Sequence, residues 1–314
     1  MNQISDRRPI TESENKAIPN KGTENKKNEN KETENKETGH IHQKKIALIN
    51  DFTGFGRCSL TVSLPIISAM KIQCCPVPTS VLSNHTAYES WFFEDFTDRM
   101  QPYIEEWKKL HLSFDGISTG FLGSEEQIQI VLRFLNDFKE KNTVVIVDPV
   151  MGDDGRPYAT YTEEMCRKMK KLAACADILT PNLTEACILT GQPWHDGRWQ
   201  IRQVRTLAET LSEMGPGRIV ITGIPQGEFI ANYCYERGMV PRFVRTHRVG
   251  MQRCGTGDVF ASVIAADAVN GVPFYNSVRK ASRFVRLCIE KSMEMDIPPT
   301  DGVCFEELLG KLCK

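Results

Sequence analysis

The sequence lacks an excess of charge of either sign. Its 314 residues include 39 Lys and Arg against 40 Asp and Glu, which gives a formal net charge of −1. Nucleic acids and anionic membranes bind proteins that carry a clear basic excess. The sequence therefore predicts neither nucleic acid nor membrane as a partner, and an anionic ligand has to be held by local geometry.

The chain also lacks a long hydrophobic run and a recognisable cysteine framework. No uninterrupted apolar stretch approaches the roughly 18 residues of a membrane span, and no apolar signal core lies near the N-terminus. The eleven cysteines are odd in number and include no C-x-x-C pair, so zinc and a set of disulfides are poorly supported. Scattered thiols suit a reducing cytosol, and we expect a cytoplasmic protein.

Residues 1–43 contain almost no apolar side chains. They read as a ragged repeat of E-N-K units, and the first 40 residues hold eight basic and eight acidic side chains. Such a segment cannot bury enough surface to offset its chain entropy. An amphipathic targeting helix is the alternative, which the many acids disfavour. We predict a disordered low-complexity tail over 1–43 and one domain over 44–314.

From Lys44 onward, short apolar runs alternate with helical patterns. This alternation predicts an α/β domain with a mostly parallel sheet covered by helices on both faces. The expected strands are "KKIALIN", "GISTG", "TVVIVDP", "ADILTPN" and "GRIVITG". The expected helices are "CSLTVSLPIISAM", "SEEQIQIVLRFLNDFKEK", "TEEMCRKMKKLAACA" and "RWQIRQVRTLAETLSEMG". Residues 227–250 instead resemble a β-hairpin.

Polar residues follow nearly every expected strand. In an open parallel sheet, ligands bind beyond the carboxyl ends of the strands. We therefore expect the strand-end groups to meet along one edge of the sheet, where the segment "RCGTGD" can join them. These groups are Asn50-Asp51, Thr119-Gly120, Asp148-Pro149, Thr180-Pro181-Asn182 and Thr222-Gly223.

The stretch "RCGTGDVFASVIAADAVNG" places a glycine-rich turn and an acid at the start of an apolar helix. The backbone N–H groups of Gly255, Thr256 and Gly257 can stabilise charge on a transferred phosphoryl group. Asp258 can accept a proton from an attacking hydroxyl, as an aspartate does in many kinases. A turn whose acid only complements the helix dipole is the alternative. The helix should stop at Gly271.

The stretch "VDPVMGDDG" follows an expected buried strand with three carboxylates. Asp148, Asp153 and Asp154 can hold Mg²⁺, directly or through water, beside nucleotide phosphates. The alternative is a polar loop whose aspartates form Asx-turns. The position of Asp148 directly after the apolar run favours the functional interpretation, whereas Asp154 is expected to be solvated.

The stretch "TPNLTEA" carries Asn182 and Glu185 on one helix face. Glu185 can orient Mg²⁺ or its water shell. The same spacing is typical of a helix N-terminus, and taken alone that interpretation is favoured.

Two further segments suit a small polar substrate. "VLSNHTAYESW" groups Ser83, His85 and Thr86 beside an aromatic side chain, as a polar heterocycle would need, although a lone histidine is more often a structural hydrogen-bonding residue. "NDFTGFGRCS" fits neither the P-loop nor the dinucleotide fingerprint. Within it, Asp51 can hydrogen-bond a substrate hydroxyl.

Taken in order, these motifs resemble the vitamin B6 (pyridoxal, pyridoxine and pyridoxamine) kinases of the ribokinase-like superfamily. The resemblance runs from about Lys44 to the C-terminus and is carried by "VLSNHTAY", "STGFLGS", "VDPVMGDDG", "TPNLTEA" and "CGTGDVFAS". It implies a three-layer α/β/α sandwich. It also implies transfer of the γ-phosphoryl group of ATP to the 5′-hydroxymethyl group of a B6 vitamer, with Mg²⁺, often a monovalent cation such as K⁺, and a homodimer.

The resemblance also assigns roles to individual residues. Asp258 would be the catalytic base, and Gly255, Thr256 and Gly257 would form the anion hole. The residues that would organise Mg²⁺ and the nucleotide are Asp148, Asn182, Glu185, Asp153, Tyr158 and Thr222. The residues on the substrate side would be Asp51, Ser83, His85, Thr86 and Phe121.

Two positions depart from the family pattern, and two alternatives stay open. The family commonly has serine at the position of Asp51 and often tyrosine at that of Phe121, and an acid at 51 favours an amine or a protonated ring nitrogen. The hydroxymethylpyrimidine (phosphate) kinases of thiamine synthesis begin with a G-S-D-S motif and carry cysteine in place of Asp258; this chain has neither, although Asp51 partly matches their early aspartate. A non-catalytic vitamer-binding relative would not need Asp258.

Overall fold

The structure is a computed structural model that describes residues 43–158 and 161–313. The predicted tail lies outside this part of the chain except for Gln43, so its disorder and the domain boundary stay predictions. The helices are α1 (Ser59–Ala69), α2 (Thr97–Lys109), α3 (Glu125–Phe138), α4 (Glu163–Ala174), α5 (Leu183–Thr190), α6 (Ile201–Met214), α7 (Thr256–Val269) and α8 (Phe274–Glu294), with short 3₁₀ turns η1 (Pro299–Asp301) and η2 (Glu306–Lys311).

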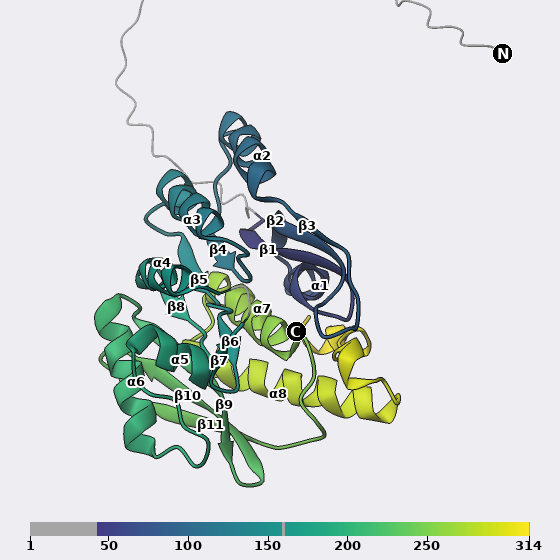
Figure 1. The fold of residues 1–314 in the computed structure, drawn as a ribbon, viewed down its shortest axis with the longest axis vertical. Coiled ribbons are helices and arrows are strands. Elements are labelled where there is room, and N and C mark those ends of the chain that lie inside the picture. Colours follow the sequence, from purple (N-terminus) through teal and green to yellow (C-terminus); the bar gives the residue numbers. More distant parts are fainter. Residues whose placement is uncertain (1–42, 159–160, 314) are drawn as a thin grey trace, which may run out of the picture. The chain divides into compact units, whose positions relative to one another are not determined.

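A nine-stranded sheet forms the centre of the described part of the chain (Figure 1). Its strands are β1 (Lys45–Phe55), β2 (Gln73–Asn84), β3 (Phe93–Asp95), β4 (Gly116–Thr119), β5 (Val144–Val147), β8 (Ile178–Leu179), β9 (Arg218–Gln226), β10 (Phe229–Glu236) and β11 (Arg242–His247). Their order is β11-β10-β9-β8-β5-β4-β1-β2-β3. All pairs from β2 to β9 are parallel, and β3, β10 and β11 add antiparallel edges. The predicted hairpin is confirmed as β10 and β11.

Side-chain alternation along the strands divides the core into two layers. In β1, Ala47 and Ile49 pack into one buried cluster with residues of α2 to α6, whereas Ile46 and Leu48 pack into the other with α1, α7 and α8. This is the period of two that a strand buried on both faces requires. The predicted three-layer α/β/α sandwich with a mostly parallel sheet is confirmed.

Strands β1 and β2 differ from the sequence prediction. The expected first strand ends at Asn50, but β1 continues to Phe55 because β2 pairs with it as far as Asn84. Strand β2 was not predicted, since Pro76 and Pro78 lie within it and proline is rare in paired strands. The register between β1 and β2 shifts between Asn50 and Phe52, where polar strand-end residues begin.

The helix predictions are confirmed within one turn at their ends. Ser124 caps α3 by accepting a hydrogen bond from the Gln127 N–H, and α7 ends at Val269 with Asn270 as its C-cap, directly before Gly271. A short hairpin of β6 (Gly152–Asp153) and β7 (Arg156–Pro157) lies between β5 and α4. None of the helices in the described part of the chain is long and apolar enough to cross a membrane.

Candidate active site

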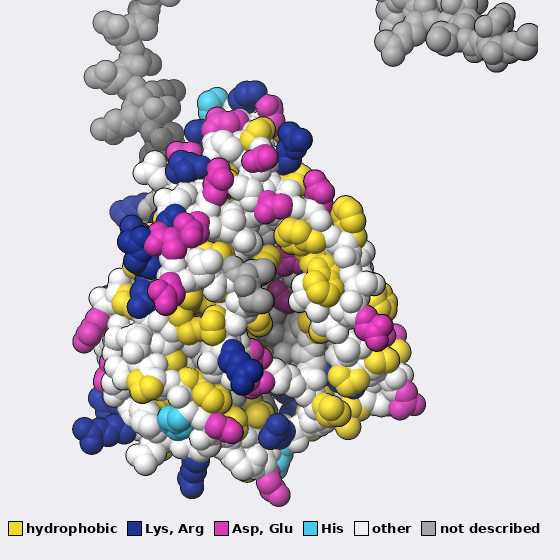
Figure 2. Space-filling view, in the orientation of Figure 1, with side chains coloured by type: hydrophobic (Ala, Val, Ile, Leu, Met, Phe, Trp, Pro, Cys, Tyr) yellow, Lys and Arg dark blue, Asp and Glu magenta, His cyan; other side chains and the backbone are white. Residues whose placement is uncertain are grey.

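Three acidic side chains from different elements meet at the carboxyl edge of the sheet. Asp148 follows β5, Glu185 lies in the first turn of α5, and Asp258 lies in the first turn of α7. Burial raises the pKa of Asp148 well above its ordinary value, and the negative charges of Glu185 and Asp258 raise it further. Figure 2 shows this face hollowed near its centre, with acidic side chains inside the hollow. The structure thus brings together three of the residues predicted for the site.

The turn Gly255–Gly257, hereafter the glycine turn, opens helix α7. Gly255 is the N-cap with a φ of 77°, and a Cβ atom there would lie 1.9 Å from the carbonyl oxygen of Arg57. Only glycine fits this position. The Thr256 hydroxyl donates to the Arg253 carbonyl at 3.3 Å. No side chain caps the helix start, so its N–H groups are available to an anion.

Asp258 is partly exposed beside the glycine turn. Its Oδ1 accepts a hydrogen bond from Asn50 Nδ2 at 3.4 Å. Burial raises the pKa of Asp258 to about 6; the Ser59 N–H and the Asn50 amide lower it, and the nearby charge of Asp51 raises it. A carboxylate with this pKa is mostly ionised at neutral pH and is a stronger base than an ordinary aspartate, as general base catalysis requires.

Glu185 makes a different set of contacts. Its Oε2 accepts from the Asn182 N–H at 2.8 Å, its Oε1 accepts from the Met151 N–H at 3.0 Å, and the Asn182 Oδ1 accepts from the Glu185 N–H at 2.9 Å. This is a complete capping box. Glu185 is 4% exposed, and burial raises its pKa to about 7. The geometry shows the helix-start role that the sequence favours, and the same contacts anchor the loop after β5.

The carboxylates near Asp148 fit Mg²⁺ only if water and substrate phosphates supply its other ligands. Among residues 43–158 and 161–313, no group of three or more His, Cys, Asp and Glu side chains could by itself hold a metal ion. Mg²⁺ in kinases is bound by one or two carboxylates, water and the substrate phosphates. Asp148 is partly exposed and has the Thr180 hydroxyl as a side-chain partner, whereas both oxygens of Glu185 are used by backbone donors. Asp148 is therefore the side chain that can contact the ion.

The residues predicted for the nucleotide lie on both sides of this carboxylate group. Asp153 accepts from Gln252 Nε2 at 2.7 Å and so links the β6–β7 hairpin to the segment before the glycine turn. Thr222 forms an isolated parallel bridge with Asn182. Tyr158 is 42% exposed beyond the hairpin, and burial of its hydroxyl end raises its pKa. The charges of Glu185, Asp153 and Asp148 act on Tyr158, so the hairpin lies beside the carboxylates at the edge of the sheet.

Asp51 is buried close to Asp258. It is 5% exposed, and its Oδ2 accepts from the Thr53 hydroxyl at 2.6 Å. Burial raises its pKa, and hydrogen bonds from Ser59 and Thr53 lower it. The carboxylate predicted to meet a substrate hydroxyl is thus already hydrogen-bonded within the chain and lies close to Asp258.

The other residues predicted for the substrate side divide into two groups. His85 Nε2 lies 2.7 Å from the Thr300 carbonyl oxygen, and its Nδ1 accepts from the Ala87 N–H at 3.2 Å. Both ring nitrogens are occupied, so His85 shows the structural role given as its alternative. Ser83 and Thr86 are exposed, and the Ser83 hydroxyl accepts from the Phe92 N–H at 2.8 Å. The Phe121 N–H donates to Asn50 Oδ1 at 2.8 Å.

Sequence reasoning missed two residues that shape the site. Asn50 was predicted as one of the strand-end groups, but no role was predicted for its amide, because its partner Asp258 lies 208 residues away in the sequence. Arg253 is 8% exposed and donates to the carbonyl groups of Ile297 at 2.7 Å and Gly302 at 3.3 Å. Its place two residues before the glycine turn was visible in the sequence, but its carbonyl partners were not.

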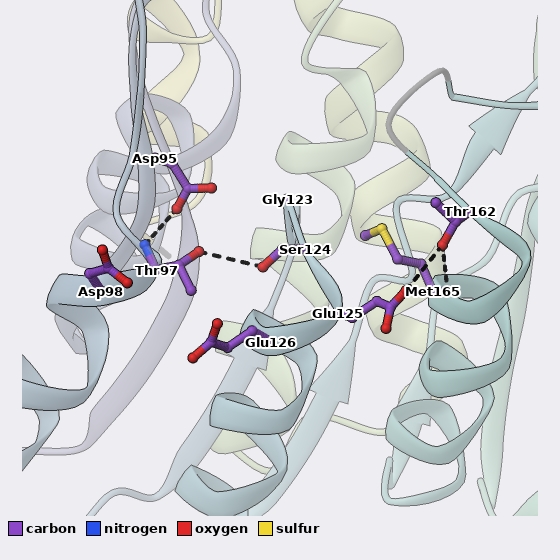
Figure 3. A pocket seen from close by; sticks show the side chains of 9 residues that line it. All are labelled: Asp95, Thr97, Asp98, Gly123, Ser124, Glu125, Glu126, Thr162 and Met165. Carbon is purple, nitrogen blue, oxygen red and sulfur yellow. Dashed lines mark hydrogen bonds between the residues drawn. The ribbon is translucent and has the colours of Figure 1, made fainter.

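A separate hollow of about 600 Å³ lies among the starts of α2, α3 and α4 (Figure 3). Its lining is Asp95, Thr97, Asp98, Gly123, Ser124, Glu125, Glu126, Thr162 and Met165. The Thr97 N–H donates to Asp95 at 2.6 Å, and the hydroxyls of Thr97 and Ser124 lie 3.4 Å apart. These contacts hold the helix starts together, and no residue predicted for the site lines the hollow.

The chain is similar to proteins of both vitamin B6 and thiamine metabolism. It is 38% identical to a candidate phosphomethylpyrimidine kinase of Bacteroides thetaiotaomicron, with a TM-score of 0.85 over 88% of this chain and 96% of the other. A second crystal form of that protein, with pyridoxal, gives a TM-score of 0.83 over 87% of this chain and 96% of the other.

Two curated relatives are the pyridoxal kinase of Sus scrofa and the thiamine biosynthetic bifunctional enzyme TH1 of Arabidopsis thaliana. The first is 30% identical over 59% of this chain and 62% of its own length. The second is 27% identical over 80% of this chain and 47% of its own length. The chain thus spans between about half and two thirds of the length of these relatives. Residues 67–300 match the family described as phosphomethylpyrimidine kinase. The chain belongs to this family and is a pyridoxal kinase-like member of the ribokinase superfamily.

Proposed function

We propose that the protein is an ATP-dependent kinase that phosphorylates the 5′-hydroxymethyl group of a B6 vitamer: pyridoxal, pyridoxamine or pyridoxine. The observation that carries the proposal is the position of Asp258. It is a partly exposed carboxylate with a raised pKa of about 6, and it lies next to an uncapped helix start. A base beside an anion-binding turn is the arrangement that phosphoryl transfer to an alcohol needs.

In the proposed step, Asp258 accepts the proton of the 5′-hydroxyl group as its oxygen attacks the γ-phosphorus of ATP. A new oxygen–phosphorus bond forms, the bond to the β-phosphate oxygen breaks, and ADP leaves. The N–H groups of Gly255, Thr256 and Gly257 bind the transferred phosphoryl oxygens. Mg²⁺, bound with ATP, would neutralise phosphate charge; Asp148 would hold it directly or through water, and Glu185 would order its water shell.

The remaining roles follow the same division of the site. Asp153, Tyr158, Asn182 and Thr222 would contact or position the nucleotide. Ser83 and Thr86, which are exposed, and Phe121 would lie on the vitamer side. Asp51 and His85 would support this side from within the chain. A monovalent cation such as K⁺ belongs to the proposal by resemblance alone.

We further propose a cytoplasmic homodimer that binds neither nucleic acid nor membrane. Support for the dimer comes from a group of exposed aromatic side chains on β1 and around β3, which comprises Phe52, Phe55, Trp91, Phe92 and Phe93. Figure 2 shows hydrophobic side chains along the side where Figure 1 places β2 and β3. Exposed apolar groups of this kind are typical of interfaces.

Phosphorylation of hydroxymethylpyrimidine is the second candidate function. The family description and the similarity to TH1 favour it, whereas the crystal form of the Bacteroides relative with pyridoxal favours the B6 vitamers. The chain carries Asp258 at the position where the resemblance gives thiamine-pathway kinases a cysteine. We therefore rank the B6 vitamers first.

The test is a phosphorylation assay with pyridoxal, pyridoxamine, pyridoxine and hydroxymethylpyrimidine side by side, with an ATPase control that contains no acceptor. We expect a phosphorylated vitamer and ADP in equal amounts. Product from hydroxymethylpyrimidine alone would overturn the substrate assignment. Binding of pyridoxal without ADP formation would instead show a non-catalytic vitamer-binding protein.

A further inference from the structure

Asn50 occupies a buried position at the point where β1 reaches the site. It is 3% exposed, and the side chain fills the space beside Gly120, where a Cβ atom would lie 2.5 Å from its amide group. A buried amide must find partners for both its oxygen and its nitrogen. The contacts of these two atoms therefore show what the residue does.

Two backbone donors fix the orientation of the Asn50 amide. Its Oδ1 accepts from the Phe121 N–H at 2.8 Å and from the Asp51 N–H at 3.0 Å. An oxygen that accepts two N–H groups cannot exchange places with the NH₂ group, since donors would then face donors. The NH₂ group has to point the other way, and there Nδ2 meets Asp258 Oδ1 at 3.4 Å.

The surroundings of Asp258 otherwise contain several acidic or titratable groups. Asp51 approaches from β1, Asp148 from the end of β5, and the thiol of Cys58 from the residue before α1. The Ser59 N–H approaches from the start of α1 and favours the charged carboxylate, as the Asn50 amide does. The backbone N–H of Asp258 itself is a third donor, and Asn50 supplies the side-chain hydrogen bond among the three that oppose the acidic neighbours.

We propose that Asn50 is a positioning residue for the catalytic base. Its amide, locked by the backbone at 51 and 121, holds the Asp258 carboxylate in place and favours its ionised form. That Asp258 is the catalytic base rests on the proposed function, but its contact with Asn50 does not depend on the substrate. The Asn50 amide thereby links Asp258 to the backbone of Phe121, a residue that the proposed function places beside the vitamer.

The test compares Asn50→Asp with Asn50→Ala. Aspartate has the same shape and still accepts both backbone N–H groups, but it turns an oxygen toward Asp258. Two adjacent carboxylates cannot both ionise readily, so we expect the titration midpoint of Asp258 to rise by at least about one pH unit. Alanine removes the donor without adding charge, and we expect a smaller rise in the same direction.

The midpoint is measured by ¹³C NMR of labelled aspartate carboxyl groups, with Asp258 assigned by its absence in Asp258→Asn. The acid limb of kcat/KM for the vitamer is recorded in parallel. Asn232→Asp is the matched control, because Asn232 is also buried and accepts from the Gly223 N–H at 3.0 Å, but donates to the Ser282 hydroxyl at 2.8 Å. That variant should lower stability without moving the midpoint of Asp258.

An Asp258 midpoint within about 0.2 pH units of the wild-type value in Asn50→Asp, or in Asn50→Ala if the first variant does not fold, would overturn the proposal, since a lost hydrogen bond has to move it further. A midpoint that moves equally in Asn232→Asp would overturn it as well. The NMR titration does not require turnover, so absence of kinase activity would refute the proposed function and leave this inference to be decided by the midpoint.

Discussion

Helices α5 and α7 begin with similar sequence signals but present different surfaces. Each carries an acid in its first turn, Glu185 in α5 and Asp258 in α7. In α5 the N-cap is Asn182, and the capping box uses side chains to satisfy the helix start. In α7 the N-cap is Gly255, which has no side chain to offer. The start of α5 is closed by side-chain hydrogen bonds, whereas the start of α7 has no side-chain cap and leaves its N–H groups available to an anion.

The same difference separates the two carboxylates. Both oxygens of Glu185 accept backbone N–H groups, whereas Asp258 is partly exposed, with the Asn50 amide and the Ser59 N–H as donors beside it. An acid at a helix start can therefore be a cap or a base, and the residue at the N-cap decides which. An asparagine fills the helix start, and a glycine leaves it open.

The largest effect is expected from Gly255→Ala. The added Cβ would lie 1.9 Å from the Arg57 carbonyl oxygen and would displace the glycine turn. Loss of one oxyanion-hole donor lowers kcat by about 10²–10³-fold, and we expect a loss of at least this size in a steady-state kinase assay. Gly191→Ala is the matched control, because Gly191 ends α5 with a similar φ of 72° and has nothing within 4 Å. It should destabilise the fold by only about 1 kcal/mol and keep kcat, and equal losses of kcat would contradict the special role of the α7 turn.

A moderate effect is expected from pH. Asp258 must be ionised to accept a proton, and its pKa is raised to about 6. Activity is therefore full above this value, and kcat/KM should fall about tenfold for each pH unit below it. The measurement is a pH profile at saturating ATP. Glu185, with a pKa of about 7, could also cause activity to fall at low pH, so Glu185→Gln is profiled beside the wild type. If the fall at low pH disappears in that variant, it is due to Glu185 and not to Asp258.

The smallest effect is expected from Glu185→Gln on stability. Glutamine replaces one acceptor oxygen with an NH₂ group, so one of the two buried backbone N–H groups loses its partner at a cost of about 1–3 kcal/mol. Thermal unfolding at pH 8, where Glu185 is ionised, should show a Tm lower by a few degrees. Asp154→Asn is the control, since Asp154 is exposed and asparagine tolerates its φ of 47°. An equal Tm in both variants would show that the capping box contributes nothing.

The sequence predicted the layers and much of the edge of the sheet, because both follow from local patterns. Short apolar runs predicted β5 and β9, and the order of strands and helices predicted the parallel sheet. Strand β2 was missed, since Pro76 and Pro78 oppose a strand locally and only its pairing with β1 supplies the reason for it. Long-range pairing of this kind leaves no periodic signal in the chain.

The site could be predicted in its residue types but not in its contacts. The motifs indicated Asp148, Glu185 and Asp258 as neighbours, and the parallel sheet brings them together. The sequence could not show that Asp51 is buried against Thr53, or that His85 bonds the Thr300 carbonyl. Those partners depend on the register shift between β1 and β2 and on the C-terminal segment, which are set by tertiary packing.

The measurement that tests the central claim most directly is the rate of phosphoryl transfer from ATP to pyridoxal in Asp258→Asn, with the ATP Kd determined on the same sample. We expect kcat to fall by about 10²-fold or more while ATP binding and Tm are retained, because the amide keeps the shape of the side chain and removes only the base. Turnover close to that of the wild type would contradict the assignment of Asp258 as the base.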